Sequence, residues 1–331
     1  MDLVTGATGF IGRHLAARLI RAGRPVRVLV RRGSEAKLPP QVATGAAIVH
    51  GDLSHRDSLF EAARGASRVF HCAGLVTDWG ADEEFAAANV QGTRWLLEAA
   101  NGAQRFVHLS SIAAFGTPAA PYFDDESPYG DSKDPYSRSK VEGERAAFEA
   151  HRATGLPVTV LRPAVVYGPG GAWLEEPLAM IEQDRMFLLG GGEGTCHPCY
   201  VENLVDAMLL AADHPAAVGQ GFIVMDGESI SFRDYFDAVA SIAGRPPIRR
   251  SIPLAAARGI AAALETAARV RRQRDRPLLT RTAIAMLTTK SRTSIAKIRR
   301  ALGWEPRYSF RAAIEELRQW YASRRGGSRS H

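Results

Sequence analysis

The chain has 331 residues, of which 46% are hydrophobic and 23% are charged. This is the composition of a folded protein with one large or two intermediate domains, and it excludes a disordered, collagen-like or coiled-coil chain. The cysteines, Cys72, Cys196 and Cys199, are odd in number, and no secretory apolar segment opens the chain. We therefore expect no disulfide framework and a cytoplasmic location. No apolar run reaches the roughly 18 residues that a membrane-spanning helix needs.

The formal net charge of +7 comes from the second half of the chain. Residues 1–160 carry equal numbers of basic and acidic side chains, whereas residues 245–300 hold 15 Lys or Arg against Glu265 and Asp275. An Ala-rich helix is expected over Leu254–Arg272, with a basic end. This pattern suits peripheral contact with the inner face of a membrane or with an acidic carrier protein. The alternative is a solvated basic face that covers a buried helix.

Short apolar runs alternate with amphipathic segments through the first half of the chain. The runs predict strands over Asp2–Thr5, Val26–Val30, Ala46–His50, Val69–Cys72, Phe106–Ser110 and Val158–Leu161. Because these strands are continuously apolar, we expect an α/β protein with a Rossmann-type doubly wound parallel sheet, covered by helices on both faces. Crossover helices are predicted over Leu53–Gly65, opened by a capping box from Ser54 to Asp57, and over Glu84–Asn101.

The polar stretch from Gly116 to Asp134 predicts a loop beside the C-terminal edge of the sheet. Beyond Pro169 the pattern is mostly helical, with helices predicted over Leu174–Gln183, Val205–His214, Phe232–Ala243, Leu254–Arg272, Ser294–Leu302 and Phe310–Ser323. We expect residues 1–168 to form a dinucleotide-binding domain to which roughly 200–226 return. Residues 169–199 and 227–323 are expected to form a smaller, mostly helical substrate domain, followed by a disordered tail at 324–331.

The first predicted strand leads directly into a glycine-rich turn and then an amphipathic helix. The turn reads Thr5-Gly6-Ala7-Thr8-Gly9-Phe10-Ile11-Gly12. Gly6 permits the tight turn, Gly9 allows the backbone to approach a pyrophosphate, and Gly12 allows the helix to pack on the strand. With these flanks, the spacing predicts a dinucleotide site formed by Gly6, Thr8, Gly9, Phe10, Ile11 and Gly12.

Arg31 and Arg32 follow the end of the second predicted strand. In proteins that bind NAD, this place usually holds an acidic residue that binds the ribose 2′-hydroxyl. Because a guanidinium suits a 2′-phosphate, we predict NADP(H) as the favoured cofactor, with NAD(H) as the alternative. Asp52 and Leu53 follow the third strand and could bracket the adenine. Ala73 and Gly74 follow the fourth strand and could pass under the cofactor.

Tyr136 and Lys140 are four residues apart and share one helix face. Asp134 is the expected N-cap and Pro135 the first helical residue, so Tyr136 falls near the positive end of the helix dipole. At about 4 Å, the Lys140 charge would contribute roughly 4 kcal/mol. We therefore expect the pKa of Tyr136 to fall from about 10 towards about 7, suited to acid/base chemistry.

Together these motifs resemble the extended short-chain dehydrogenase/reductases over nearly the whole chain. Further segments in family order are Asn89-Val90-Gln91-Gly92-Thr93, Ser110 to Gly116, and Leu161-Arg162-Pro163 through Tyr167-Gly168-Pro169. The resemblance implies that Ser111 polarises the substrate oxygen, that Tyr136 is the acid/base, and that Lys140 holds the nicotinamide ribose. It also implies cofactor contacts by Asn89 and Pro163, and direct hydride transfer between nicotinamide and substrate.

At several positions the chain departs from motifs of the family, and these departures disfavour some of the family's reactions. Sugar-nucleotide dehydratases have Thr-Asp-Glu where this chain has Ser111-Ile112-Ala113, so dehydration lacks its acid and base. Epimerases usually have an Asn and an Arg where Val165 and Cys196 stand, which makes a sugar-nucleotide epimerase the second choice. The segments Tyr200 to Ala207, Pro277 to Arg281 and Leu302 to Pro306 resemble 3-beta-hydroxysteroid and sterol dehydrogenases, dihydroflavonol reductases and 2-alkyl-3-oxoalkanoate reductases. This implies a hydrophobic ketone or its secondary alcohol, with Val165, His197 and Tyr200 as candidate substrate contacts.

Other features of the sequence indicate a metal site, a nucleic-acid complex or a non-catalytic role only weakly. Cys196-His197-Pro198-Cys199 lacks a second ligand pair for zinc and the strand-to-helix setting of a redox pair, so we expect no metal. His197 could equally be an ordinary loop histidine. No nucleic-acid recognition module is present, and we expect a homodimer rather than a nucleic-acid complex. A dinucleotide-binding sensor or scaffold without turnover is an alternative of another class, disfavoured because Ser111, Tyr136 and Lys140 are all present.

Overall fold

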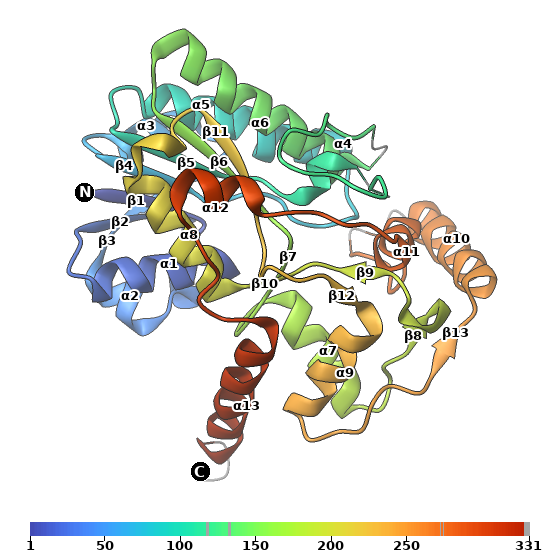
Figure 1. Ribbon diagram of the computed structural model, residues 1–331. Helices are drawn as coiled ribbons and strands as arrows, with labels where there is room; N and C mark the ends of the chain where they lie inside the picture. The colour runs from blue at the N-terminus through green and yellow to red at the C-terminus, as the bar shows by residue number, and fades with distance from the viewer. Residues whose placement is uncertain (117–118, 132–133, 272, 274, 328–331) are drawn as a thin grey trace.

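The computed structural model describes residues 1–116, 119–131, 134–271, 273 and 275–327. Its centre is a seven-stranded sheet in the order β11-β6-β5-β4-β1-β2-β3, and every pair of neighbouring strands is parallel (Figure 1). The strands are β1 Asp2–Thr5, β2 Val26–Val30, β3 Ala46–His50, β4 Arg68–His71, β5 Arg105–Leu109, β6 Val158–Pro163 and β11 Gln220–Val224. This confirms the predicted doubly wound α/β fold.

Helices cover both faces of the sheet, as Figure 1 shows. One layer holds α3 (Arg56–Ala63), α5 (Gly92–Ala99) and α6 (Pro135–Thr154). The other holds α1 (Phe10–Arg21), α2 (Pro40–Gly45), α8 (Val201–Asp213) and α12 (Ala296–Leu302). The apolar faces of both layers pack on the sheet, so the strands are largely buried from both sides, except the edge strand β3, which stays partly exposed. Segment 200–226 thus contributes both α8 and the edge strand β11 to the sheet domain.

The predicted start of the helix over Leu53–Gly65, with its capping box from Ser54 to Asp57, is wrong. Helix α3 begins at Arg56 after His55, and no side chain caps it. Ser54 instead donates both its amide and its hydroxyl to Oδ1 of Asp52, at 2.8 and 2.7 Å. The predicted helix over Glu84–Asn101 is confirmed as three joined pieces: α4 (Asp82–Phe85), a π-helical segment (Ala86–Gln91) and α5.

The remaining residues form a mostly helical second region with short two-stranded pairings. Its helices are α7 (Ala172–Glu182), α9 (Phe232–Ile242), α10 (Leu254–Val270), α11 (Arg281–Thr288) and α13 (Phe310–Gly327). Its short strands are β7 (Val165–Tyr167), β8 (Leu188–Leu189), β9 (Thr195–Cys196), β10 (Pro198–Tyr200), β12 (Ile230–Ser231) and β13 (Ser251–Ile252). In the part of the chain that the structure describes, no helix has the length and apolarity to cross a membrane.

The predicted disordered tail is wrong for its first four residues. Helix α13 continues through residues 324–327, and Arg324 donates to the Glu175 carboxylate at 2.8 Å. This contact joins the end of α13 to α7 and favours an ordered helix beyond Ser323. Residues 328–331 lie outside the described part of the chain.

Candidate active site

The glycine turn brings strand β1, helix α1 and the end of β4 into close contact. A Cβ atom on Gly6 would lie 2.8 Å from the Ala73 amide nitrogen, and the φ angle of Gly6 is +75°. A Cβ atom on Gly12 would lie 2.3 Å from the Gly6 carbonyl oxygen. Both positions therefore require glycine. Gly9 is the N-cap of α1 and supplies no side-chain cap, which leaves the first-turn amides of Phe10, Ile11 and Gly12 free to bind a diphosphate.

Arg31 and Arg32 are exposed at the end of β2. Nε of Arg31 lies 3.9 Å from Oδ2 of Asp52, which follows β3, so the two predicted residues are brought together. Partial burial opposes ionisation of Asp52, but the Ser54 hydrogen bonds and the Arg31 charge hold the pKa of its carboxyl below the usual value. This end of the site therefore holds two exposed guanidinium groups beside one ionised carboxylate.

Asn89 links the loop after β4 to the catalytic helix. Its Oδ1 accepts a hydrogen bond from the Leu75 amide at 2.7 Å, and its Nδ2 donates to Oγ of Ser139 at 2.9 Å. A Cβ atom on Gly74 would lie 2.9 Å from Asn89 Oδ1 and 3.9 Å from Lys140 Nζ. The structure thus places Gly74, Asn89 and Lys140 side by side, with the π-helical segment supplying Asn89. Such segments are frequent at functional sites.

Helix α6 begins as the sequence predicts. Asp134 accepts a hydrogen bond from the Ser137 amide at 2.8 Å, and Pro135 is the first helical residue. Tyr136 lies in the first turn and meets Ser111, which follows β5, through a hydrogen bond between their side chains. Lys140 is buried, and its Nζ donates to the Leu109 carbonyl at 3.0 Å. The three predicted catalytic side chains therefore converge at the C-terminal end of β5.

The expected lowering of the Tyr136 pKa is wrong. Burial raises this pKa to about 12, and the Ser111 hydrogen bond only partly offsets that effect. Lys140 Nζ lies 5.7 Å from the centre of the Tyr136 ring and is held by Leu109. Burial also lowers the pKa of Lys140 to about 8, although the Glu144 charge opposes the change. In this state Tyr136 is a neutral phenol at neutral pH, which is the form that donates a proton.

Sequence reasoning missed a buried acid next to this triad. Glu144 lies one turn after Lys140 on α6 and is fully buried. Its carboxylate accepts hydrogen bonds from Ser110, from Tyr129 at 3.0 Å, and from the Arg162 guanidinium at 2.8 to 3.1 Å. Arg162 also pairs with buried Asp125 at 3.5 Å. The spacing of four residues from Tyr136 to Lys140 to Glu144 is a signal that could have indicated this position.

The three predicted substrate contacts lie around one small strand pair. Val165 and Tyr200 belong to β7 and β10, which are parallel, and the Val165 amide donates to the His197 carbonyl at 2.9 Å. His197 is buried, with Nδ1 2.8 Å from Ser229 Oγ and Nε2 3.1 Å from Ser291 Oγ. A substrate contact by the His197 ring would require one of these hydrogen bonds to break. The structure therefore has the His197 ring packed in the interior, with both ring nitrogens next to serine hydroxyls.

The other chemistry-bearing groups do not form a second site. Cys72, Cys196 and Cys199 are free thiols, and the described residues contain no cluster of His, Cys, Asp or Glu that could hold a metal ion. Pro163 ends β6 beside Val224 of β11.

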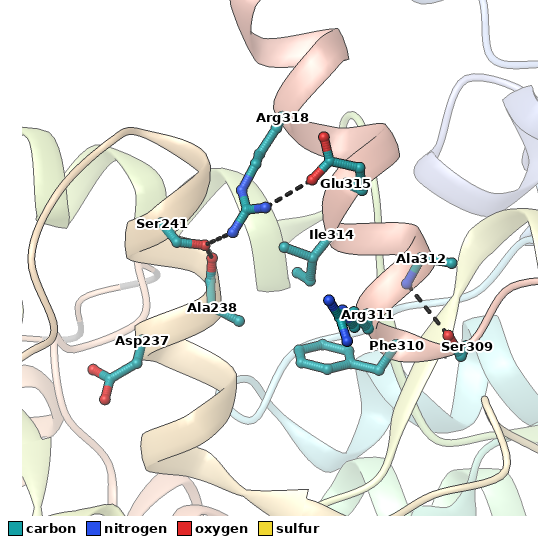
Figure 2. A pocket seen from close by; sticks show the side chains of 10 residues that line it. All are labelled: Asp237, Ala238, Ser241, Ser309, Phe310, Arg311, Ala312, Ile314, Glu315 and Arg318. Atoms are coloured by element: carbon teal, nitrogen blue, oxygen red, sulfur yellow. Dashed lines mark hydrogen bonds and ion pairs between the residues drawn. The ribbon is translucent and has the colours of Figure 1, made fainter.

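A groove of about 680 Å³ lies between α9 and α13, and Figure 2 shows the side chains that line it. Arg318 of α13 crosses it to reach Ser241 of α9 at 3.0 Å, and it also pairs with Glu315 on its own helix at 2.7 Å. None of the residues that line the groove is a predicted cofactor, catalytic or substrate residue. The candidate active site is therefore the sheet edge around Ser111, Tyr136 and Lys140.

Comparison with known proteins agrees with this geometry. Residues 3–225 match the model of the NAD dependent epimerase/dehydratase family. The chain belongs to that family. It is accordingly an NAD(P)-dependent oxidoreductase with the extended short-chain dehydrogenase/reductase architecture, as the sequence motifs predict.

Two curated relatives match almost end to end. The chain is 31% identical over 321 residues to the 4-hydroxy-2-methyl-3-oxo-4-farnesyl-3,4-dihydroquinoline-1-oxide ketoreductase of Stigmatella aurantiaca, covering 96% of this chain and 95% of the relative. It is 30% identical over 333 residues to the 2-alkyl-3-oxoalkanoate reductase of Stenotrophomonas maltophilia (strain K279a), covering 96% and 98%. The solved structure of epimerase Mth375 from Methanothermobacter thermautotrophicus superposes with a TM-score of 0.81 at 22% identity, over 99% of this chain and 94% of that one. This last likeness concerns the fold.

Proposed function

We propose that the protein reduces a ketone on a large apolar molecule to the secondary alcohol, with NADPH as the preferred reductant. The observation that carries this proposal is the convergence of Ser111, Tyr136 and Lys140 at the C-terminal end of β5, where buried Lys140 donates to the Leu109 carbonyl at 3.0 Å and lies 5.7 Å from the centre of the Tyr136 ring. A phenol that keeps its proton at neutral pH is poised to protonate an oxygen on which negative charge develops. That is what ketone reduction requires.

Each group of the triad has a separate task in this reaction. The dinucleotide, when bound, supplies the hydride. The Ser111 hydroxyl polarises the ketone oxygen, and the Tyr136 phenol transfers its proton to that oxygen. The Lys140 ammonium, protonated below about pH 8, stabilises the phenolate that remains. Gly74 lets the loop after β4 lie close to Asn89 and Lys140, since a Cβ atom there would crowd Asn89 Oδ1 at 2.9 Å.

An apolar substrate is supported by the two curated relatives. One is named a ketoreductase of a farnesyl-bearing ring, and the other is named a reductase of 2-alkyl-3-oxoalkanoates. Both names describe a ketone attached to a large hydrocarbon group. In this chain, Val165 and Cys196 stand where a sugar diphosphate would need an amide and a cation. An apolar substrate needs neither group, so it loses no binding contact at these two positions.

The preference for NADPH rests on Arg31 and Arg32. Both are exposed at the end of β2, and no carboxylate occupies the first position after that strand. The 3.9 Å separation between Arg31 and Asp52 is long for an ion pair, so the guanidinium is free to turn towards a 2′-phosphate. A charge-assisted contact of this kind contributes about 1.5–3 kcal/mol.

A substrate panel tests the proposal. The purified protein would be assayed with NADPH or NADH and 3-oxoalkanoates of increasing chain length, a 3-ketosteroid, and UDP-glucose. We expect oxidation of NADPH with the long-chain ketones, a kcat/KM that rises with chain length, and an unchanged sugar nucleotide. Conversion of UDP-glucose to its epimer without net consumption of NADPH, together with inert ketones, would overturn the proposal.

A further inference from the structure

One side of helix α10 carries no charge and is exposed. Its buried side consists of Ala257, Ala261, Glu265 and Ala268. The exposed side, here called the α10 outer face, comprises Ala255, Ala256, Gly259, Ile260, Ala262, Ala263, Thr266, Ala267 and Val270. Ile260 is 45% and Val270 is 80% exposed. Figure 1 shows α10 at the edge of the molecule, beside α11 and away from the large sheet.

Other exposed apolar side chains come from the same part of the molecule. The large hydrophobic residues that are most exposed after Val270 are Val76 at 70% and Leu278 at 64%. Leu278 lies between α10 and α11, and Val76 lies in the loop after β4. That loop touches the α10–α11 segment, because the Trp79 indole donates to the Gln273 carbonyl at 3.3 Å and Arg276 pairs with Asp78. Exposed apolar surface of this kind usually marks an interaction site.

Positive charge surrounds the α10 outer face. The one acidic residue of the helix, Glu265, is buried and holds Arg281 at 2.8 Å and Arg269 at 3.5 Å. Arg258 and Arg271 are exposed on α10 and at its C-terminal end, and neither forms an ion pair with any of the described residues. The segment that contains α10, residues 245–300, carries 15 basic side chains, of which Lys297 and Arg299 lie away from α10 on α12, against two acidic ones. An uncharged strip bordered by unpaired arginines complements a surface that is apolar beneath an anionic layer.

We propose that the α10 outer face docks on an anionic bilayer surface. An amphipathic helix with an apolar side and basic borders lies in the membrane interface, with its apolar side at the boundary between headgroups and acyl chains. A protein partner is less well matched, because protein interfaces depend on large aromatic anchors and the α10 outer face offers alanines, a glycine, a threonine and two larger aliphatic side chains. Small side chains let the helix backbone lie close to the lipid, while Arg258 and Arg271 meet the phosphates.

The position of α10 connects docking to the active site. The loop that contacts the α10–α11 segment begins directly after Gly74, which borders Lys140. Docking through α10 therefore holds this rim of the site near the lipid, where an apolar substrate is dissolved. Only this last step rests on the proposed function, since binding to the bilayer requires no turnover.

Vesicle binding tests the inference on the full chain. Flotation would be measured with phosphatidylcholine vesicles and with vesicles that contain an added fraction of phosphatidylglycerol, at low and high salt. We expect the protein to bind the anionic vesicles at low salt, and to bind them at least about 10-fold more weakly at high salt or without phosphatidylglycerol. Equal binding to both vesicles, or no salt-sensitive binding, would overturn the inference.

Two double variants and a control locate the surface. Ile260→Glu with Val270→Glu changes only exposed side chains, and Arg258→Glu with Arg271→Glu reverses the unpaired charges. Both should lower anionic-vesicle affinity by about 10-fold or more. The control, Arg64→Glu with Arg311→Glu, makes the same change of charge as the arginine variant but elsewhere on the surface, and it should bind clearly more tightly than either.

Circular dichroism and reduction of a short, water-soluble ketone would show that all variants remain folded. If the variants bind vesicles as the control does, or if Ile260→Glu with Val270→Glu instead dissociates an oligomer, the outer face is not a membrane surface.

Discussion

The Ser110 hydroxyl donates a hydrogen bond of 2.5 Å to the carboxylate of Glu144. Ser110 immediately precedes Ser111 at the end of β5, and Glu144 follows Tyr136 by two helical turns on α6. This contact ties the end of the strand to the helix and thereby sets the separation of Ser111 from Tyr136. Arg162 of β6 holds the other side of the carboxylate. Glu144 is therefore a positioning residue for the two groups that meet the substrate oxygen.

Replacing Glu144 by Gln should lower kcat by about 10- to 100-fold, because misplacement by a fraction of an ångström is costly in an oriented site. The affinity for NADP(H) should change by less than about 3-fold, since the glycine turn is untouched. The Glu144 charge also raises the pKa of Lys140, so the alkaline limb of the pH–rate profile should move to lower pH in the variant. Steady-state kinetics across pH 6 to 9 would measure both effects.

The matched control is Glu142→Gln on an exposed part of the same helix, where Glu142 pairs with Arg145 at 2.6 Å. It should leave the pH profile unchanged, because surface ion pairs contribute about 0–1 kcal/mol. An unshifted alkaline limb in a folded Glu144→Gln protein would contradict the positioning role.

Replacing Tyr136 by Phe should lower kcat by about 10²- to 10⁴-fold, because this is the usual contribution of a general acid. The phenol transfers the proton, whereas the glycine turn holds the phosphates, so the dissociation constant for NADPH should stay nearly the same. Fluorescence titration and kinetics would separate these quantities. Near-normal turnover by the variant would show that another group protonates the substrate.

The pH dependence of turnover should follow Lys140. Burial lowers its pKa to about 8, so its ammonium is present below that pH and lost above it. We expect kcat for ketone reduction to fall as the pH rises through about 8, because the phenolate left on Tyr136 then lacks a neighbouring positive charge. The Lys140→Met variant should have a low kcat at every pH, and its kcat should not fall further as the pH rises through about 8. A rate that continues to rise above pH 9 in the wild type would contradict the assignment.

Replacing Arg31 by Asp should reverse the cofactor preference. An attraction worth about 1.5–3 kcal/mol becomes a repulsion, so the ratio of kcat/KM for NADPH over NADH should fall by at least about 10-fold. Arg21→Asp, an exposed change on α1, is the control and should keep the wild-type ratio. If the ratio survives in Arg31→Asp, Arg32→Asp would show whether the second arginine reads the phosphate.

The stability of the fold should decline in mild acid through His71. This ring is buried, with Nδ1 2.8 Å from Thr5 and Nε2 2.9 Å from Thr93, and burial lowers its pKa to about 3, helped by Lys140. The unfolded chain binds a proton near pH 6.5, so stability present above that pH is lost as the pH falls towards 3. Between pH 7 and pH 5 the loss is about 2 kcal/mol at 1.36 kcal/mol per pH unit.

Urea unfolding at both pH values would measure this change. His71→Gln should lose about 2 kcal/mol less than wild type over the interval, whereas His55→Gln at the surface should lose as much as wild type. Equal losses in all three proteins would assign the acid sensitivity to other groups, such as His197, whose pKa burial lowers to about 4.

Local patterns in the sequence were sufficient for much of the fold and for the triad. The bounds of β1, β2 and β3 and the Asp134 cap follow from neighbouring residues alone, because apolar runs and capping chemistry act within a few positions. The identities of Ser111, Tyr136 and Lys140 likewise follow from short spacings on one strand end and one helix. Strand β11 was missed because its short run around Gly221 becomes a strand only by pairing with β6.

Tertiary structure decided the chemistry of those same residues. The pKa of Tyr136 was expected to fall but rises, because burial by distant segments outweighs a Lys140 that is held by the Leu109 carbonyl. Glu144 acquires its role only when β5, β6 and α6 bring Ser110 and Arg162 around one carboxylate. The outward apolar side of α10 is likewise visible only once α11 has taken the opposite side. Desolvation and long-range contacts depend on which segments meet, and a linear pattern does not contain that information.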